Sequence, residues 1–358
     1  MSTAANSARP RVSVIILNWN GRDYLAACLP SLLRQTYPNF EVVVVDNGST
    51  DGSGAFVEQQ FPQARLIGND RNLGFAAANN QAIRATQGEF VALLNNDTVA
   101  DPRWLEALLA AAADPAVGMV ATQMRLAHRP DRIDSAGVAI DRAGIAWGVD
   151  GGAPVAAAPP TAVTETFGAS GGAALYRRAM LDDNGLFDEA FFAYLEDVDL
   201  AWRAQWAGWR ALYAPGAVVT HHHSATGNRI PHFKSRLLGR NKLWLLAKNY
   251  PFPALLWYLP IIALYEGMSL AVAWRERRLR SALAGRWEAL RRLPMMLARR
   301  RRLVKRISAQ QMMARLHPVE APWRVLRRYG HTPPAGPAAG HQAEAPTTVN
   351  KGVNKGLT

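Results

Sequence analysis

Short runs of apolar and β-branched residues alternate with longer amphipathic stretches through the N-terminal part of the chain. Apolar runs of this length indicate buried strands, whereas apolar residues spaced three and four apart indicate helices. We expect strands at residues 12–17, 41–46, 64–67, 90–94 and 117–121. We expect helices between them at residues 24–33, 76–86 and 104–113. This alternation predicts an α/β fold with βαβ units and a mostly parallel, doubly wound sheet.

Polar loops follow three of the expected strands, at residues 18–21, 46–52 and 95–98. Crossover connections between parallel strands are almost always right-handed, so these loops should share one edge of the sheet. Ligands of open α/β sheets bind at that edge, beyond the carboxyl ends of the strands. Neither G-x-G-x-x-G after the first strand nor G-x-x-x-x-G-K-[ST] occurs, which disfavours dinucleotide-binding and Walker-type sites.

The loop after residues 90–94 holds Asn95, Asn96 and Asp97, and Asp101-Pro102 follows as a helix start signal. Carboxylate and amide oxygens are ligands that Mg²⁺ or Mn²⁺ prefers, and these ions usually share their coordination with substrate phosphates. The alternative is that the three residues only turn the chain and cap a helix.

The loop after the second strand begins with Asp46, whose carboxylate should emerge where a base or ribose could be hydrogen-bonded. Ser49 and Asp51 can cap the next helix, and capping alone is sufficient to explain Asp51. Residues 71–75 precede another helix start, so Arg71 and the backbone amides there can meet a phosphate or a nucleoside.

The middle of the chain is less regular. Gly and Pro are frequent between residues 123 and 166, and we expect an irregular, mobile segment there that serves as a substrate flap. A Gly-rich turn at residues 167–172 then leads into a strand. Gly171 and Gly172 indicate either close approach of the backbone to a ligand or a packing requirement.

Carboxylates follow a cluster of aromatic residues in the stretch 191–199. Glu196, Asp197 and Asp199 open a helix, and the helix dipole alone favours acids in a first turn. Because aromatic residues precede them, Glu196 and Asp197 should be partly desolvated, which raises the pKa of a carboxyl group toward that of a useful general base. Asp199 and Arg203 are four residues apart and should form an ion pair.

Three adjacent histidines follow a short strand further along the chain, at residues 221–223. In a strand His221 and His223 lie on one face, so these two are candidate metal contacts. Solvated or core histidines are the alternative.

Together these motifs resemble the family 2 glycosyltransferases of the GT-A fold, and among them the bacterial rhamnosyltransferase-like members. The resemblance covers about residues 11–250 and depends on the order and spacing of the motifs. These are Asn18-Trp19-Asn20, Asp46-Asn47-Gly48-Ser49-Thr50-Asp51, Arg71-Asn72-Leu73-Gly74-Phe75, Leu94-Asn95-Asn96-Asp97, Glu196-Asp197-Val198-Asp199 and the stretch at His221. It implies a Rossmann-like, mostly parallel sheet flanked by helices. It also implies transfer of a sugar, with rhamnose as a candidate, from a nucleotide diphosphate donor to an acceptor hydroxyl with inversion.

The resemblance further implies a role for each motif. Asp197 is the base with Glu196 beside it, and Asp97, the last residue of a D-x-D motif, contacts Mg²⁺ or Mn²⁺, with His221 as a further metal or diphosphate contact. Asp46 holds the base of the donor. The other expected donor contacts are Asn18, Asn20, Asn47, Ser49, Asp51, Arg71, Asn72, Gly74, Asn95 and Asn96. The expected acceptor contacts are Gly171, Gly172 and Tyr194.

Two departures from the family pattern bear on mechanism. Asn95 replaces the first Asp of D-x-D, and a neutral oxygen weakens the charge of the metal site. The Q-x-x-R-W motif of processive members is absent, which favours addition of a single sugar per event. One base suffices for a single displacement with inversion, whereas retention would require a second carboxylate as nucleophile, and the sequence leaves that alternative open.

The C-terminal part changes character, since residues 252–274 are strongly apolar and a run of arginines follows them up to Arg306. The formal net charge of the 358-residue chain is +13, which indicates a polyanionic partner. A single span would put the arginines and the donor-binding domain on opposite sides of the bilayer, although both are expected in the cytoplasm. We therefore expect helices lying on the anionic inner leaflet, with a soluble helical appendage as the alternative.

The expected organisation is a disordered segment at 1–10, a GT-A domain at 11–231, a basic and apolar helical region at 232–330, and a disordered tail at 331–358. Cys28, the only cysteine, should be a buried helix residue, and we expect no signal peptide because residues 1–10 lack an apolar segment. We expect a cytoplasmic enzyme, peripheral on the plasma membrane, that acts on a glycan or lipid-linked acceptor.

Two functions from other classes remain as alternatives. One is a catalytically inactive, membrane-bound scaffold of the same fold. The other is a nucleic-acid-binding protein that uses the arginine run. Nucleic acid is disfavoured because the aromatic residues in that region have apolar neighbours rather than lying on a basic β surface.

Overall fold

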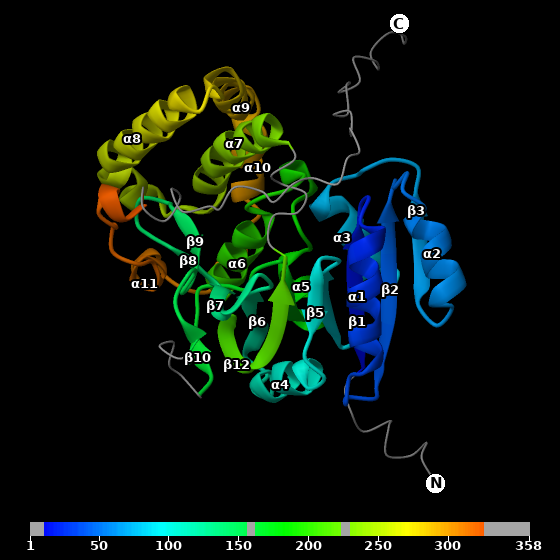
Figure 1. The fold of residues 1–358 in the computed structure, drawn as a ribbon. Helices are drawn as coiled ribbons and strands as arrows, with labels where there is room; N and C mark the ends of the chain where they lie inside the picture. The colour runs from blue at the N-terminus through cyan, green and yellow to red at the C-terminus, as the bar shows by residue number, and fades with distance from the viewer. Residues whose placement is uncertain (1–10, 156–161, 223–229, 326–358) are drawn as a thin grey trace, which may run out of the picture.

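The computed structural model describes residues 11–155, 162–222 and 230–325, and it has a mixed β-sheet at its centre (Figure 1). The strand order is β10-β12-β6-β11-β4-β1-β2-β3, with β5 paired to β12 and β7 paired to β6. These strands are β1 (Val12–Asn18), β2 (Phe40–Asn47), β3 (Arg65–Asn69), β4 (Phe90–Asn95), β5 (Thr98–Ala100), β6 (Val117–Leu126), β7 (Arg129–Ser135), β10 (Thr164–Glu165), β11 (Ala173–Arg177) and β12 (Arg210–His221). The predicted α/β fold class is confirmed.

The N-terminal half of the sheet follows the βαβ pattern. β1, β2, β3 and β4 pair in parallel, and their bounds agree with the expected strands to within two residues. β11 then runs antiparallel between β4 and β6. The strand expected at residues 117–121 therefore joins the sheet through β11 rather than beside β4, and the sheet is mixed.

Helices cover both faces of the sheet, because alternate residues of each strand point to opposite sides. On β1, Val12, Val14 and Ile16 face one core, and Ile15 faces the other. The first core is covered by α1 (Arg22–Leu33), α2 (Ser53–Gln60) and α4 (Trp104–Ala111). The second is covered by α3 (Phe75–Arg84), α5 (Arg178–Asn184) and α6 (Glu196–Trp206). Cys28 is buried on α1, as expected, and burial raises the pKa of its thiol to about 12.

The expectation of an irregular flap between residues 123 and 166 is wrong for most of that segment. β6 continues to Leu126, β7 pairs antiparallel with it, and β8 (Val138–Ile140) forms a hairpin with β9 (Ala146–Gly148). Ile133 and Val138 are buried in the second core. β6 also pairs with the distant strand β12, and Val138 of β8 bridges to Gly168. The frequent Gly and Pro residues therefore misled a local interpretation. Residues 156–161 lie outside the described residues.

The C-terminal helices are α7 (Pro231–Asn249), α8 (Phe252–Arg275), α9 (Leu279–Arg291), α10 (Leu293–Arg300) and α11 (Ala309–Arg315). α7 buries Trp244, Leu245 and Leu246 in the second core of the sheet domain, and α9 and α10 pack on α7 (Figure 1). The helical region is thus continuous with the core of the sheet. The segments expected to be disordered, 1–10 and 331–358, lie outside the described residues.

α8 is largely exposed. Within the described part of the chain it alone is long and apolar enough to cross a membrane, with a mean hydropathy of 1.5, and only 11% of its apolar window is buried. Its acid, Glu266, faces inward and pairs with Lys242 of α7 (2.8 Å) and Arg286 of α9 (2.7 Å). The apolar surface of α8 is therefore directed outward.

α7 and α9 approach closely at Gly285, where a Cβ atom would lie 2.0 Å from the backbone oxygen of Arg236. We expect Gly285→Ala to lower the free energy of unfolding by about 1–3 kcal/mol, because the α7 backbone would have to move. The measurement is equilibrium unfolding in denaturant.

Gly267→Ala is the matched control, since Gly267 is an exposed helical glycine on α8 with nothing within 4 Å of a built Cβ. It should raise the free energy of unfolding by about 0.5–1 kcal/mol, because alanine is the better helix former. Equal stability of the two variants would contradict the close contact between α7 and α9.

Candidate active site

The sequence suggested that the turn carrying Asp97 leads directly into a helix. In the structure this turn leads into a short strand instead. β5 follows the turn at Thr98 and pairs antiparallel with the end of β12, where His221 is opposite Thr98. α4 begins only at Trp104. The backbone amide of His222 donates to the carbonyl oxygen of Asp97 at 3.0 Å. This pairing brings two residues that are distant in sequence, Asp97 and His221, side by side.

His221 lies between two carboxylates. Its Nε2 atom is 3.2 Å from Oδ1 of Asp97, and its Nδ1 atom is 2.6 Å from Oδ2 of Asp134. All three side chains are about nine-tenths buried. Burial lowers the pKa of His221, but the hydrogen bonds to Asp134 and Asp97 and the charges of these two carboxylates outweigh burial and raise that pKa to about 10. A cation that binds Nε2 would displace the proton there, because a metal ligand must be deprotonated. His223 lies outside the described residues.

The donor atoms of Asp97 and His221 fit a divalent cation. Two ligands of one ion, each about 2.0–2.2 Å from it and at right angles, are about 3 Å apart, which matches the separation of 3.2 Å between these atoms. Oδ1 of Asp97 is buried, and apart from its contact with His221 it has no hydrogen-bond partner within the described ranges. Among the described residues, no cluster of three or more His, Cys, Asp or Glu side chains is placed to hold a metal ion. The remaining ligands would come from substrate phosphate and water.

The loops after β1 and β2 are joined through Asn18, which is fully buried. Its Nδ2 atom lies 3.4 Å from Oδ1 of Asp46 and 3.2 Å from the hydroxyl oxygen of Ser49, and its Oδ1 atom accepts from Asn96 at 2.7 Å. The backbone amide of Asn20 also donates to Ser49, at 2.9 Å. The three polar loops expected at one edge of the sheet thus meet there, and the carboxylate of Asp46 stays half-exposed.

Some expected donor contacts have structural partners that account for them. Asp51 accepts from the backbone amides of Arg22 and Ser53, at 2.9 and 3.0 Å, and these hydrogen bonds lower its pKa although partial burial opposes them. It therefore caps two helices, which was the alternative explanation for it. Asn47 is buried and uses its side chain to hold the loop of residues 69–74.

The other residues of that loop lie at the same edge. Asn72 accepts from the amide of Gly74 at 2.8 Å, and Arg71 is exposed. Gly74 has a φ of +84°, and a Cβ there would lie 2.6 Å from the ring of Phe192. Glycine is required at this position because the backbone is left-handed and tightly packed.

Asp197 lies at the start of α6, half-buried. Its Oδ2 atom accepts from the amide of Gly171 at 3.0 Å, and its Oδ1 atom accepts from the amide of Val198 at 2.8 Å. Burial raises the pKa of Asp197, although these hydrogen bonds oppose the rise. The carboxylate is therefore a stronger base than a solvated one, as the flanking aromatic residues predicted.

Glu196 differs from its neighbour. It is buried, and its Oε2 atom accepts no hydrogen bond within the described part of the chain. Burial, and then the charge of Asp197, raise the pKa of Glu196 well above 4.5. Tyr194 is half-buried, and burial together with Glu196 raises its pKa to about 12. The two acids at the start of α6 therefore have different electrostatic environments.

The two ends of the site meet at a pair of glycines. The amide of Gly171 binds Asp197, while the carbonyl oxygen of Gly172 accepts from the amide of Asn95 at 2.8 Å. A Cβ at Gly171 would lie 2.9 Å from the ring of Phe75, so packing alone is sufficient to require glycine there. Asp197 is thus joined through Gly171–Gly172 to the turn that carries Asp97.

The segment before Asp197 has an unusual backbone. Phe192, Tyr194 and Leu195 have φ values of +66°, +70° and +68°, a conformation that costs about 1 kcal/mol or more for each non-glycine residue. Asn241 of α7 holds it, because its Nδ2 atom donates to the carbonyl oxygens of Phe191, Ala193 and Tyr194 at 3.0, 2.9 and 2.7 Å. Sequence reasoning missed Asn241; a polar residue on the buried face of a helix was the available signal.

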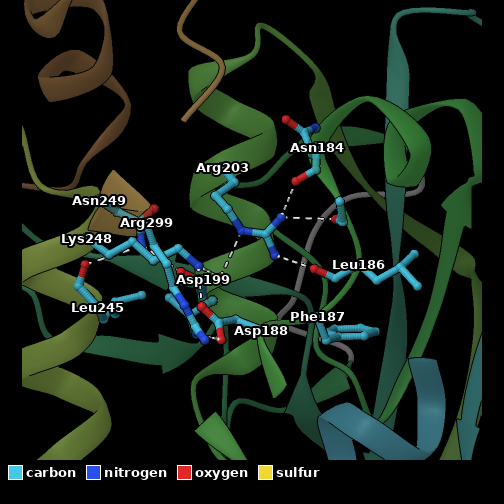
Figure 2. A network of polar contacts seen from close by, with 12 residues as sticks. Asn184, Leu186, Phe187, Asp188, Asp199, Arg203, Leu245, Lys248, Asn249 and Arg299 are labelled. Carbon is cyan, nitrogen blue, oxygen red and sulfur yellow. Dashed lines mark hydrogen bonds and ion pairs between the residues drawn. The ribbon is translucent and has the colours of Figure 1, made fainter. Parts of the chain in front are cut away.

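A buried charge network anchors the other side of α6 (Figure 2). Asp199 pairs with Arg203, as expected, at 2.9 Å and with Lys248 of α7 at 2.8 Å, and Lys248 also reaches Asp188 at 2.7 Å. Burial raises the pKa of Asp199, but the charges of Lys248 and Arg203 outweigh it and lower the pKa to about 2. Arg299 of α10 pairs with Asp188. The C-terminal helices therefore fix the helix that carries Asp197.

Comparisons with known proteins agree with this architecture. The family model "Glycosyl transferase family 2" matches residues 13–185. The chain is 32% identical over 231 residues to the O-antigen biosynthesis protein RfbC of Myxococcus xanthus, which covers 61% of this chain and 18% of that protein. It is 30% identical over 242 residues to the N-acetylglucosaminyl-diphospho-decaprenol L-rhamnosyltransferase of Mycobacterium tuberculosis, which covers 61% of this chain and 78% of that protein. The chain spans about a quarter or less of the length of the first two curated relatives.

Two solved structures share the fold. One is the mannosyltransferase PcManGT from Pyrobaculum calidifontis in complex with GDP-Man and Mn²⁺, with 23% identity, a TM-score of 0.50, and coverage of 83% of this chain and 85% of that one. The other is GalNAc-T7 with UDP, GalNAc and Mn²⁺, with 16% identity, a TM-score of 0.51, and coverage of 67% and 50%. This chain belongs to glycosyl transferase family 2 and has the GT-A fold.

Proposed function

We propose that the enzyme moves one sugar, with rhamnose as the candidate, from a nucleoside diphosphate donor to a hydroxyl of a lipid-linked or cell-envelope glycan, with inversion. The observation that carries the proposal is the link between Asp197, a half-buried base, and the Asp97–His221 pair through Gly171–Gly172. The similarity to a rhamnosyltransferase whose name specifies a diphospho-decaprenol acceptor supports the choice of sugar and acceptor class.

At the donor end, Asp97 and His221 would hold Mg²⁺ or Mn²⁺. When bound, such an ion neutralises the charge that develops on the leaving diphosphate. Asn18 and Ser49 hold the loop from which Asp46 would hydrogen-bond the base of the nucleotide. Exposed Arg71 would contact phosphate or ribose. The fold of the solved relatives bound to nucleotides and Mn²⁺ supports this arrangement.

At the acceptor end, Asp197 would take the proton of the attacking hydroxyl. The hydroxyl oxygen forms a bond to the anomeric carbon, the bond from that carbon to the diphosphate oxygen breaks, and the diphosphate leaves with the bonding electrons. Gly171, Gly172 and Tyr194 border Asp197 and would contact the acceptor. Burial and the charge of Asp197 raise the pKa of Glu196, which disfavours an ionised, nucleophilic second carboxylate at this position and so favours inversion over retention.

The catalytic assignment is tested by replacing Asp197 with Asn. We expect Asp197→Asn to lower kcat by about 10²–10⁴-fold, because a general base contributes about that much. The control is Glu196→Gln, which should retain most of the activity because burial raises the pKa of Glu196 and the neutral amide has the same size as the protonated acid. The measurement is steady-state transfer from a nucleoside diphosphate sugar, with circular dichroism to confirm folding. Unchanged transfer by Asp197→Asn would favour an inactive scaffold or a different base.

We also propose that α8 and α9 lie on the anionic inner face of the plasma membrane. Their outward side chains include Trp257 (81% exposed), Trp274 (71%) and Trp287 (64%). A spanning orientation would place Glu266, Lys242 and Arg286 within hydrocarbon, which is costly. A helix lying on the surface leaves that ion pair network intact, with the arginines of α9 and α10 near lipid headgroups.

Membrane binding is tested by sedimentation with vesicles containing phosphatidylglycerol. We expect the triple change of Trp257, Trp274 and Trp287 to Ala to weaken binding at least tenfold, because tryptophan anchors apolar surface at the interface. The control is Leu33→Ala, which removes an exposed apolar side chain from α1. Wild-type protein that binds no vesicles, or a triple variant that binds as tightly as wild type, would contradict the orientation proposed for α8.

A further inference from the structure

Asp134 is a buried carboxylate that neither the motifs nor the resemblance singled out. It lies on β7 and is within 2.6 Å of Nδ1 of His221. The two strands that carry these residues are not neighbours, because β6 lies between β7 and β12. A side chain that reaches across a whole strand to bind one nitrogen of a histidine requires a specific backbone arrangement.

A β-bulge supplies that arrangement. Along β6 and β7, Met124 is opposite Ser135 and Arg125 is opposite Ile133, so Asp134 is the extra residue at the shift in register. Bulges redirect a side chain, and they are frequent beside active sites. The backbone on both sides of Asp134 is fixed, since Ile133 donates to Ala153 and Ala136 donates to Val149, each at 2.9 Å. The carboxylate is therefore held in place before any ligand binds.

Each of the two imidazole nitrogens of His221 therefore faces a different carboxylate. Asp134 faces Nδ1, while Asp97, the proposed metal ligand, faces Nε2 at 3.2 Å. Histidines that bind a metal through one nitrogen usually donate the other N–H to a carboxylate or carbonyl group, which fixes the tautomer and the orientation of the ring. Both side chains of the His221–Asp134 pair are only 9% exposed, so water competes little for this hydrogen bond.

We propose that Asp134 is a positioning residue for the divalent cation: it accepts the Nδ1 proton of His221 and so directs the Nε2 lone pair toward the ion held with Asp97. This inference rests on the proposed metal site. It extends the site by a residue that touches neither the ion nor the substrate. A structural ion pair between Asp134 and His221 would instead affect stability without affecting metal affinity.

The test is a titration of the full chain with Mn²⁺ alone, in which binding is monitored by the electron paramagnetic resonance signal of the free ion. The melting temperature of the protein is measured in parallel. We expect Asp134→Asn to weaken Mn²⁺ binding by about 10–100-fold, because loss of such a partner typically has that effect. The matched control is Asp131→Asn on the same strand, whose carboxylate is 73% exposed; it should bind Mn²⁺ as wild type does.

A second measurement covers the case in which Asp134→Asn does not fold. In ¹⁵N-histidine NMR spectra of the wild-type protein with Mg²⁺, His221 should be the tautomer protonated at Nδ1. A folded Asp134→Asn variant with wild-type Mn²⁺ affinity, or a His221 protonated at Nε2 under Mg²⁺, would overturn the role of Asp134 while leaving the metal site in place. Wild-type protein that binds no Mn²⁺ would overturn this inference and the metal part of the proposed function, but would leave Asp197 as base untouched.

Discussion

The short antiparallel pairing of β5 with β12 is the constraint on which the donor end of the site depends. It places Thr98 opposite His221, and so brings the turn of Asp97 against a histidine more than a hundred residues away in sequence. The same end of β12 is reached by Asp134 through the bulge in β7. A carboxylate, an imidazole and a second carboxylate thus lie in a row because three backbone features coincide: a tight turn, a three-residue strand and a bulge.

The acceptor end depends on the C-terminal helices. Three left-handed, non-glycine residues precede Asp197, and such a backbone persists only where the surroundings determine it. Asn241 holds it from one side, and the Asp199 network holds α6 from the other (Figure 2). Both come from α7, which in turn packs against the helices that we propose face the membrane. The region that we propose binds the lipid surface and the region that orients the proposed base therefore share one helix.

Local patterns predicted β1 to β4 and their helices, because buried apolar runs and turn residues report on nearby structure. They also predicted the desolvation of Asp197 and Glu196 from the aromatic residues before them. They failed between residues 123 and 166, where β7 and β8 form short hairpins with β6 and β9, and these hairpins are held by distant segments, since β6 pairs with β12 and Val138 bridges to Gly168. Asp134 could not be identified, because its importance depends on a bulge that only tertiary structure creates. Asn241 was missed although a polar residue on the buried face of a helix was an available signal, because the strained loop that it holds is itself a tertiary feature. Asp51 shows the converse, since its motif position suggested donor binding, whereas its carboxylate accepts from the first backbone amides of α1 and α2.

The most direct test of the account is a crystal structure of the full chain with Mn²⁺ and a nucleoside diphosphate of uracil, thymine or guanine, recorded at the manganese absorption edge. The account predicts an anomalous peak about 2.0–2.3 Å from Oδ1 of Asp97 and Nε2 of His221. It also predicts that the diphosphate extends from that peak toward the Gly171–Gly172 pair and Asp197. A manganese peak away from Asp97 and His221, or a diphosphate separated from Asp197 by core side chains, would contradict it.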